Sequence, residues 1–316
     1  MQLSIIKNLK IKLANDKIFK ANNYPEMNSK VFNKIAKTPI QRKEKFRVKD
    51  NLLNSDTISA ILTYSFGKTI ALNFANANVA GGAYILGGEA QEEALCRASL
   101  LYYTIKTQRK FYCKNRLHFI PTYTNNMIYS ANVPIIRDNK GNLLENPKFC
   151  DFITSPAVNR YLSKLFFIPD KIIYKIMKER ISNIIALAAL KQPDLLILGA
   201  WGCGAFGNKR EIIYPLFEEA INLYLPEKVK VIFADTRWNW LKIPFFNQTE
   251  IKMPVVNVKI IEGRTVEQKR EMVKKITQAI VESIGVPAEA ITISIEDMKK
   301  ENYAQAGVLR LDKDAK

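Results

Sequence analysis

Two adjacent glutamates, Glu92 and Glu93, follow a glycine-rich loop and lie at the start of a predicted helix. Cleaving a glycosidic bond needs an acid that protonates the departing oxygen, and groups that hold the sugar while it gains positive charge. Adjacent helical residues diverge by about 100°, so neighbouring carboxyl groups can perform different tasks. Acidic residues in a first helical turn are also ordinary partners of the helix dipole, so the pair alone does not establish catalysis.

Glycines flank the segment before this pair, at 81–82 and 87–88, and a second glycine loop, WGCGAFGN, occupies 201–208. Glycine lets backbone N–H groups close on an anion, and a helix N-terminus adds positive potential. The two loops follow apolar runs, 69–75 and 194–200, that are typical of buried parallel strands. Because ligands gather at the carboxyl ends of such strands, the loops together predict a phosphate or diphosphate site.

The elements that position these loops alternate between strand and helix, which predicts an α/β sandwich with a mostly parallel sheet. The predicted strands are 69–75, 126–136, 194–200 and 228–234, and the predicted helices are 89–108, 171–190 and 210–224. Residues 1–50 are basic and poorly periodic, and we expect two short helices there, near 4–20 and 26–37.

The chain of 316 residues is long enough for two domains, and 47% of its residues are apolar. Of the net charge of +18, residues 254–316 carry +1 and residues 1–253 carry +17. Such a field favours phosphorylated ligands or nucleic acid, although a solvated basic surface explains it equally well. No apolar run is long enough for a membrane span, and the N-terminus lacks a signal peptide, so we expect a cytoplasmic protein that does not bind membranes.

Metal and histidine chemistry are not indicated by the sequence. The four cysteines lie far apart and form no CxxC pair, and His118 is the single histidine. A zinc site needs such residues at short spacing, so we expect no metal and no cofactor. The cysteines fit reduced, buried thiols.

Three ordered blocks resemble the microbial-type poly(ADP-ribose) glycohydrolases: NFANANVAGGAYILGGEAQEEALCRASLLY, MIYSANVPIIRDNKGNLLENPKFCDFITSPAVN and LLILGAWGCGAFGNKREII. The resemblance covers about residues 60–235. It implies a macrodomain-like α/β/α fold that binds ADP-ribose and hydrolyses the O-glycosidic bond of ADP-ribose conjugates. The polymer, a single ADP-ribose on a side chain and a small-molecule conjugate all remain candidate substrates. The alternative is a domain that binds ADP-ribose without turnover.

The resemblance implies roles for individual residues. Glu93 corresponds to the catalytic acid, Glu92 holds ribose hydroxyls, and Gln91 supports the loop. A helix N-terminus lowers the pKa of a carboxyl, so burial or a nearby diphosphate must raise it again in a general acid. The other implied ligand-binding residues are Asn76 near the ribose, Gly81, Gly82, Ala83, Gly202, Gly204 and Ala205 near the diphosphate, and Phe206 on the scissile ribose.

This chain departs from the family pattern in the first loop. The family's Pro-Gly-Gly-Gly is Ala80-Gly81-Gly82-Ala83 here. A Cβ at Ala83 can block a close approach of the backbone or exclude a positive φ, which puts ligand affinity in question more than chemistry.

The composition changes near residue 250, and the C-terminal segment has a regular pattern. A strand at 254–261, a helix with a Thr265–Gln268 capping box and a strand at 290–298 predict a βαβ unit. We therefore divide the chain into a macrodomain-like domain (1–245, with a helical extension at 1–50), a junction (246–253) and a C-terminal module (254–316). Two strands and one helix bury too little apolar surface to be stable alone. We therefore expect this module to form a homo-oligomer.

The segment from Pro254 to residue 313 is similar to the 4-oxalocrotonate tautomerase family, which forms hexamers from such units. The resemblance implies that Pro254 is the catalytic base, Arg264 binds a substrate carboxylate and Tyr303 is an aromatic wall. Thr292 stands where the founding enzyme has a second arginine, so a different substrate is expected.

The nitrogen of Pro254 is an amide in this chain because Met253 precedes it, and an amide nitrogen cannot accept the proton. Three explanations stay open: a module that serves only assembly, an internal start or cleavage that frees Pro254, and an artificial fusion. Assembly is the one we favour.

Overall fold

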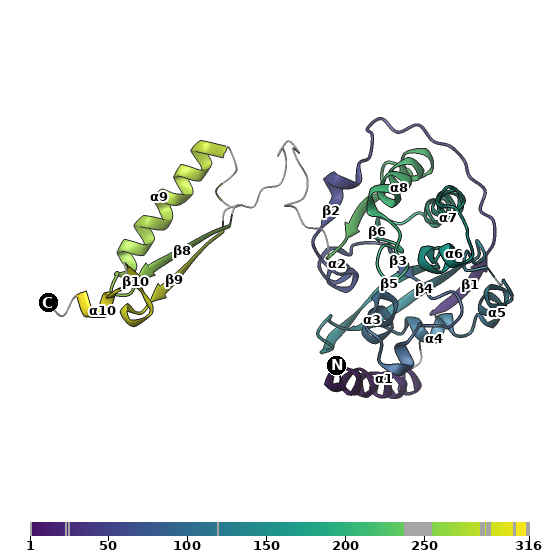
Figure 1. Ribbon diagram of the computed structural model, residues 1–316, viewed down its shortest axis with the longest axis horizontal. Coiled ribbons are helices and arrows are strands. Elements are labelled where there is room, and N and C mark those ends of the chain that lie inside the picture. The colour runs from purple at the N-terminus through teal and green to yellow at the C-terminus, as the bar shows by residue number, and fades with distance from the viewer. Residues whose placement is uncertain are drawn as a thin grey trace. The chain divides into compact units, whose positions relative to one another are not determined.

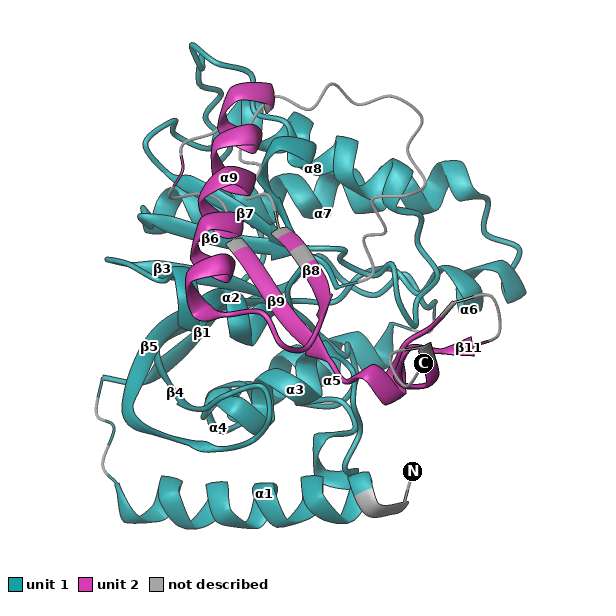
Figure 2. Cartoon of the chain, turned by 90° about the vertical axis from the view of Figure 1, so that its left-hand side faces the viewer, with its two compact units in different colours: residues 1–239 teal, residues 240–316 magenta. Residues whose placement is uncertain are grey.

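The computed structural model describes residues 2–22, 24, 26–118, 120–236, 255–284, 288, 292–305 and 308–313. The chain forms two compact units, Met1–Asn239 and Trp240–Lys316, which Figure 2 distinguishes by colour. The predicted junction, residues 246–253, and Pro254 lie outside the described residues.

A seven-stranded sheet with the order β1-β4-β5-β3-β6-β7-β2 forms the centre of the first unit (Figure 1). Its strands are β1 (Asn28–Phe32), β2 (Leu52–Leu53), β3 (Thr69–Phe74), β4 (Met127–Arg137), β5 (Leu143–Ser155), β6 (Leu195–Gly199) and β7 (Lys230–Ala234). The pairings from β5 through β3, β6 and β7 to β2 are parallel, whereas β1–β4 and β4–β5 are antiparallel.

Helices cover both faces of this sheet. They are α1 (Gln2–Ala21), η1 (Val48–Asn51), α2 (Thr57–Tyr64), η2 (Tyr84–Leu86), α3 (Gln91–Ala98), α4 (Leu101–Ile105), α5 (Arg109–Leu117), α6 (Arg160–Leu165), α7 (Asp170–Lys191) and α8 (Arg210–Tyr224). Side chains of β3 alternate between two apolar clusters: Ile70 and Leu72 pack with α7 and α8, and Ala71 packs with α2, α3 and α5. This alternation confirms the predicted α/β/α sandwich.

The structure corrects three expectations about the elements. Where a second N-terminal helix was expected near 26–37, Asn28–Phe32 form β1, an edge strand antiparallel to β4. The expected helix 89–108 is broken into α3 and α4 at Ser99, whose Oγ donates to the Leu95 carbonyl and accepts from the Leu101 N–H. Strand β5 was not expected, because its first half is exposed and lacks an apolar period.

The second unit contains the predicted βαβ pattern. Its elements are β8 (Val255–Ile261), α9 (Val266–Ile284), β9 (Thr292–Met298), η5 (Lys300–Asn302), β10 (Ala304–Gln305), β11 (Val308–Leu309) and α10 (Arg310–Lys313). Strands β8 and β9 are parallel. The capping box before α9 is reciprocal: Thr265 N–H donates to Gln268 Oε1 at 3.0 Å, and Gln268 N–H donates to Thr265 Oγ1 at 3.2 Å. Within the described parts of both units, no helix combines the length and apolar character that a membrane crossing requires.

Candidate active site

A cavity of about 760 Å³ lies at the carboxyl ends of β3, β6 and β7. Phe74, Ala200 and Ala234, which end or directly follow these strands, line it. Among the residues expected from the sequence, the cavity brings together Asn76, Gln91, Glu92, Glu93, Gly202, Gly204, Ala205 and Phe206. The paired glutamates and the second glycine loop therefore face one space of the size that small-molecule ligands occupy.

Glu93 is buried, with 8% of its surface exposed, and its two carboxyl oxygens differ. Oε1 accepts a hydrogen bond from the Ala83 N–H at 2.8 Å. Oε2 is buried and makes no hydrogen bond within the described part of the chain. A buried carboxyl oxygen without a partner is costly unless a ligand supplies one, so Oε2 is the atom that is available to a substrate.

Glu92 is more deeply buried, at 2% exposure, and both of its oxygens are engaged. Oε1 accepts from Asn73 Nδ2 at 3.1 Å, and Oε2 accepts from the Asn76 N–H at 2.7 Å. Burial, with a smaller contribution from the neighbouring Glu93, raises the pKa of Glu92 to about 8 against the opposing hydrogen bonds. Glu92 therefore retains its proton at neutral pH.

Gln91 fixes the start of α3 to the end of β3. Its Oε1 accepts from the Phe74 N–H at 2.9 Å, and its Nε2 donates to the Leu72 carbonyl at 3.0 Å and to Thr57 Oγ1 at 3.1 Å. Asn76 holds the chain beyond β3, where its Oδ1 accepts from two following backbone N–H groups. These contacts set the position of both glutamates relative to the sheet.

The first glycine loop supports the glutamates from behind. Gly81 and Gly82 have φ values of +71° and +55°, and a Cβ on Gly82 would lie 2.4 Å from Glu93 Oε1. Ala83 has φ −89°, a value open to alanine, so its Cβ does not strain this backbone. Gly81, Gly82 and Ala83 are not among the described residues that line the cavity.

Helix α1 packs on the same loop. Asn8 Nδ2 donates to the Gly87 carbonyl at 3.0 Å, and the buried Asn15 donates through Nδ2 to the Arg97 carbonyl at 2.9 Å. Asn15 Oδ1 accepts from Arg137 Nε at 2.9 Å. The N-terminal helix is thus an integral support of the loop that carries the glutamates.

The second glycine loop is held rigidly beside the cavity. Trp201 is fully buried, and its Nε1 donates to the Ser155 carbonyl at 3.0 Å. Gly202 has φ +73°, and Asn208 binds its carbonyl through both Nδ2 and the backbone N–H. These restraints hold residues 204–206 at the wall of the cavity.

Several cavity residues were missed by the sequence analysis. Arg210 and Asp235 form a bidentate pair, with Nε–Oδ2 at 2.6 Å and Nη2–Oδ1 at 3.0 Å, and Tyr214 donates to the same carboxylate. Asp56, which caps α2, and Thr57 also line the cavity. Asp235 directly follows a predicted parallel strand, a position that could have identified it.

The residues implied for the C-terminal site are only partly described. Arg264 is exposed and follows Gly263, whose φ is +103°. Tyr303 is half-buried, and its carbonyl accepts from the Arg310 N–H at 2.8 Å.

Known families match both units. Residues 2–138 match the family described as "Microbial-type PARG, catalytic domain", and residues 254–311 match "Tautomerase enzyme". The solved poly(ADP-ribose) glycohydrolase of Thermomonospora curvata is 24% identical, with a TM-score of 0.62 over 73% of this chain and 93% of its own. That likeness shows the fold. The poly(ADP-ribose) glycohydrolase of Deinococcus radiodurans, solved in complex with ADP-ribose, is 31% identical over 58% of this chain and 75% of its own, with a TM-score of 0.52.

The chain belongs to the microbial-type poly(ADP-ribose) glycohydrolase family and carries a tautomerase-family domain at its C-terminus. The family match begins at residue 2, so helix α1 is part of the glycohydrolase-type domain. For the tautomerase-family domain, the 2-hydroxymuconate tautomerase of Bacillus subtilis is 53% identical over 55 residues, which are 17% of this chain and 89% of that protein. A probable tautomerase of Bacillus cereus is 48% identical over 61 residues, 19% of this chain and 100% of its own length.

Proposed function

We propose that this chain hydrolyses the O-glycosidic bond of ADP-ribose conjugates and releases ADP-ribose. The observation that carries the proposal is the buried, unpartnered Oε2 of Glu93 beside the cavity, while Oε1 is fixed by the Ala83 N–H. Family membership and the relative solved with ADP-ribose support this reaction.

The proposed mechanism uses Glu93 as the acid. Its Oε2 protonates the departing glycosidic oxygen, the bond from that oxygen to the anomeric carbon breaks, and positive charge develops on the ribose. Water then attacks the anomeric carbon, and its proton returns to the Glu93 carboxylate. The products are ADP-ribose and an acceptor with a free hydroxyl group.

Glu92 contributes the second carboxyl. Because its pKa is raised to about 8, Glu92 enters the reaction with its own proton at neutral pH. We propose that Glu92 binds the ribose hydroxyls. It also holds the start of the loop, because its Oε2 accepts a hydrogen bond from the Asn76 N–H.

Around this pair, the second glycine loop supplies the remaining contacts in the proposal. Gly202, Gly204 and Ala205 offer backbone to the diphosphate, and Phe206 packs on the scissile ribose. Asn76 lies near the ribose. The loop Gly81, Gly82 and Ala83 acts mainly by positioning Glu93. The Ala83 N–H binds the Glu93 carboxyl, and Gly82 leaves the space that this carboxyl occupies.

Incubation with ADP-ribosylated protein and with free poly(ADP-ribose), followed by mass spectrometry of the small products, tests the proposal. We expect released ADP-ribose from at least one conjugate. If the chain binds ADP-ribose but releases it from no conjugate, the proposed hydrolysis is wrong and the chain only binds ADP-ribose.

For the tautomerase-family domain we propose a role in assembly of a homo-oligomer, with boundaries at 254–316 and a junction at 246–253. Pro254 acts as a base only if a free N-terminus is produced there, and Arg264 and Tyr303 then face the substrate. We also expect the chain to act in the cytoplasm; its four cysteines are free thiols. Nucleic acid remains the less favoured partner of the basic surface.

A further inference from the structure

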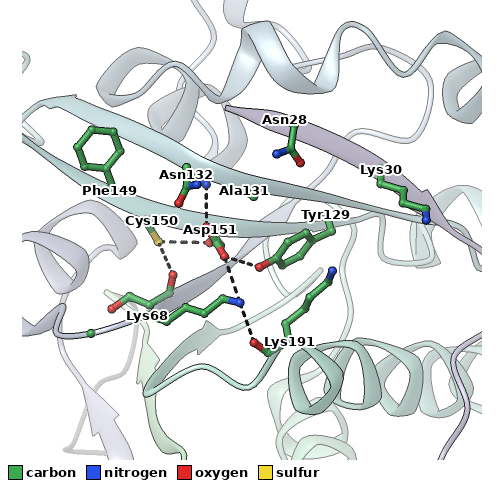
Figure 3. Close-up of a pocket in the computed structure, with 12 residues that line it drawn as sticks. Asn28, Lys30, Lys68, Tyr129, Ala131, Asn132, Phe149, Cys150, Asp151 and Lys191 are labelled. Carbon is green, nitrogen blue, oxygen red and sulfur yellow. Dashed lines mark hydrogen bonds and ion pairs between the residues drawn. The ribbon is translucent and has the colours of Figure 1, made fainter. Parts of the chain in front are cut away.

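Figure 3 shows the residues that line a second cavity, of about 670 Å³. This cavity lies at the opposite end of β3 from the candidate active site. Thr69 begins β3 and lines the second cavity, whereas Phe74 ends β3 and lines the active site. Strand residues rise about 3.3 Å each, so the two cavities are separated by roughly 16 Å of strand. The second cavity is therefore a site of its own.

Three lysines bring positive charge to this cavity: Lys30 from β1, Lys68 just before β3, and Lys191 at the end of α7. Lys30 Nζ and Lys191 Nζ lie 5.8 Å and 5.1 Å from the centroid of the same ring, that of Phe32. Burial lowers the pKa of Lys191, and Lys68 and Lys30 lower it further. The three ammonium groups thus repel one another within one space, and a bound anion would relieve that repulsion.

The acidic group that faces these lysines is already engaged. Asp151 Oδ1 accepts from the Asn132 N–H at 2.8 Å, and Oδ2 accepts from the Tyr129 hydroxyl. Its nearest ammonium group among the described residues is Lys68 Nζ, at 4.0 Å, which also donates to the Lys191 carbonyl at 2.8 Å. The hydrogen bond from Lys68 Nζ to the Lys191 carbonyl also balances the partial negative charge at the C-terminal end of α7. Positive charge from Lys30 and Lys191 is therefore left in excess.

Two further features suit an organic anion rather than a bare ion. Phe149 on β5 is 56% exposed at the cavity and offers a ring face. Asn28 and Asn132 present amide groups from β1 and from the bulge in β4, as Figure 3 shows. Asn132 has φ +52°, an uncommon value for a residue other than glycine, and this bulge directs it to the cavity rim. Proteins hold single-stranded nucleic acid by the same combination of basic groups near the phosphates and an aromatic ring on which a base stacks.

We propose that this cavity binds a nucleoside diphosphate group, with Lys30 and Lys191 on the phosphates and Phe149 on the base. Its volume is in the range of small-molecule sites. The proposal gives part of the +17 charge of residues 1–253 a specific ligand. The group comes either from a free nucleotide or from an ADP unit of a longer ADP-ribose chain.

Affinity labelling of the full chain tests the proposal without requiring turnover. Periodate-oxidised ADP carries aldehydes that form imines with lysine amines, which borohydride reduces to stable adducts for peptide mass spectrometry. We expect Lys30 and Lys191 to be labelled on the order of tenfold faster than the exposed Lys110, a difference of about 1.4 kcal/mol in effective affinity. Oxidised adenosine, which lacks phosphate, should lose this preference, and excess ADP should suppress it. Equal labelling of Lys110, or equal labelling by oxidised adenosine, would overturn the proposal.

A double variant, Lys30→Gln with Lys191→Gln, distinguishes the two sources, with Lys110→Gln as the matched control. If a chain of ADP-ribose occupies the cavity, the double variant raises KM for poly(ADP-ribose) several-fold and leaves KM for a mono-ADP-ribosylated peptide unchanged. If a free nucleotide occupies it, both KM values stay unchanged, and ADP still protects the wild type from labelling. Either result supports the site. Failure of the labelling is distinct from failure of the proposed hydrolysis, which is scored by released ADP-ribose.

Discussion

At the scale of single residues, the two glutamates occupy one helical turn but have different environments. Glu92 accepts hydrogen bonds at both oxygens, whereas Glu93 leaves Oε2 for a substrate. The helix N-terminus favours ionised carboxyls there, yet burial outweighs it at Glu92 and raises its pKa to about 8. The raised pKa of Glu92 therefore arises mainly from desolvation.

Replacing Glu92 by glutamine should change how stability depends on pH. In the unfolded chain this carboxyl ionises near its ordinary pKa of 4.5, and in the folded chain near 8. The stability it contributes is thus present below pH 4.5 and is lost as pH rises to 8. The variant has no such proton, so its unfolding free energy relative to wild type should rise by on the order of 1 kcal/mol per pH unit between pH 5 and 8. Urea unfolding at three pH values measures this; a difference independent of pH would contradict the shift.

At the scale of elements, the glutamates are placed by three segments that converge on the N-terminus of α3. Gln91 ties α3 to the end of β3, the first glycine loop supports Glu93, and α1 supports the loop through Asn8 and Asn15. The family match likewise includes this N-terminal helix.

Gly82→Ala tests this support. The added Cβ would lie 2.4 Å from Glu93 Oε1 on a backbone with φ +55°, so the carboxyl must move. We expect turnover to fall on the order of 100-fold, because displacing a catalytic group by about 1 Å has such effects. ADP-ribose release rates and thermal melts measure the change. Gly204→Ala is the control for thermal stability, because nothing lies within 4 Å of its added Cβ. If Gly82→Ala and Gly204→Ala lose equal stability, the clash with Glu93 is not the cause of the loss, and the proposed support of Glu93 is contradicted.

The sequence predicted the elements whose signals are local. The strands β3, β6 and β7 are apolar runs that end at glycine loops or polar residues, and α7 and α8 match their predicted ranges closely. The helix predicted near 26–37 was wrong, because this segment is poorly periodic and only its pairing with β4 makes Asn28–Phe32 a strand. The position of Asp235 after a predicted strand could have identified that residue, but no spacing pattern reveals its pairing with Arg210, because the two are distant in sequence.

At the scale of the whole molecule, the chain joins domains of two enzyme families whose chemistry is unrelated. The first unit holds both cavities described above, and the net charge of +17 belongs to residues 1–253. The tautomerase-family domain is nearly neutral and resembles much shorter relatives of which it covers about nine-tenths or more. Because Met253 precedes Pro254, the proline nitrogen of the second domain is an amide in this chain.

The intact chain should therefore show no tautomerase activity on a simple enol acid. A secondary amine is required as the base, and Met253 acylates the nitrogen of Pro254. Intact mass and N-terminal sequencing establish the state of the chain before the ultraviolet assay for tautomerisation. Cleavage that exposes Pro254 should produce activity, whereas activity from verified uncut chain would refute the amide argument.

The central claim is that Glu93 is the acid that cleaves the glycosidic bond. Calorimetric binding of ADP-ribose and its release from an ADP-ribosylated protein, measured side by side for wild type and Glu93→Gln, test it most directly. We expect the variant to bind ADP-ribose nearly as tightly as wild type and to release it on the order of 100- to 10,000-fold more slowly, the usual range for loss of a general acid. Release at the wild-type rate by Glu93→Gln would contradict the account.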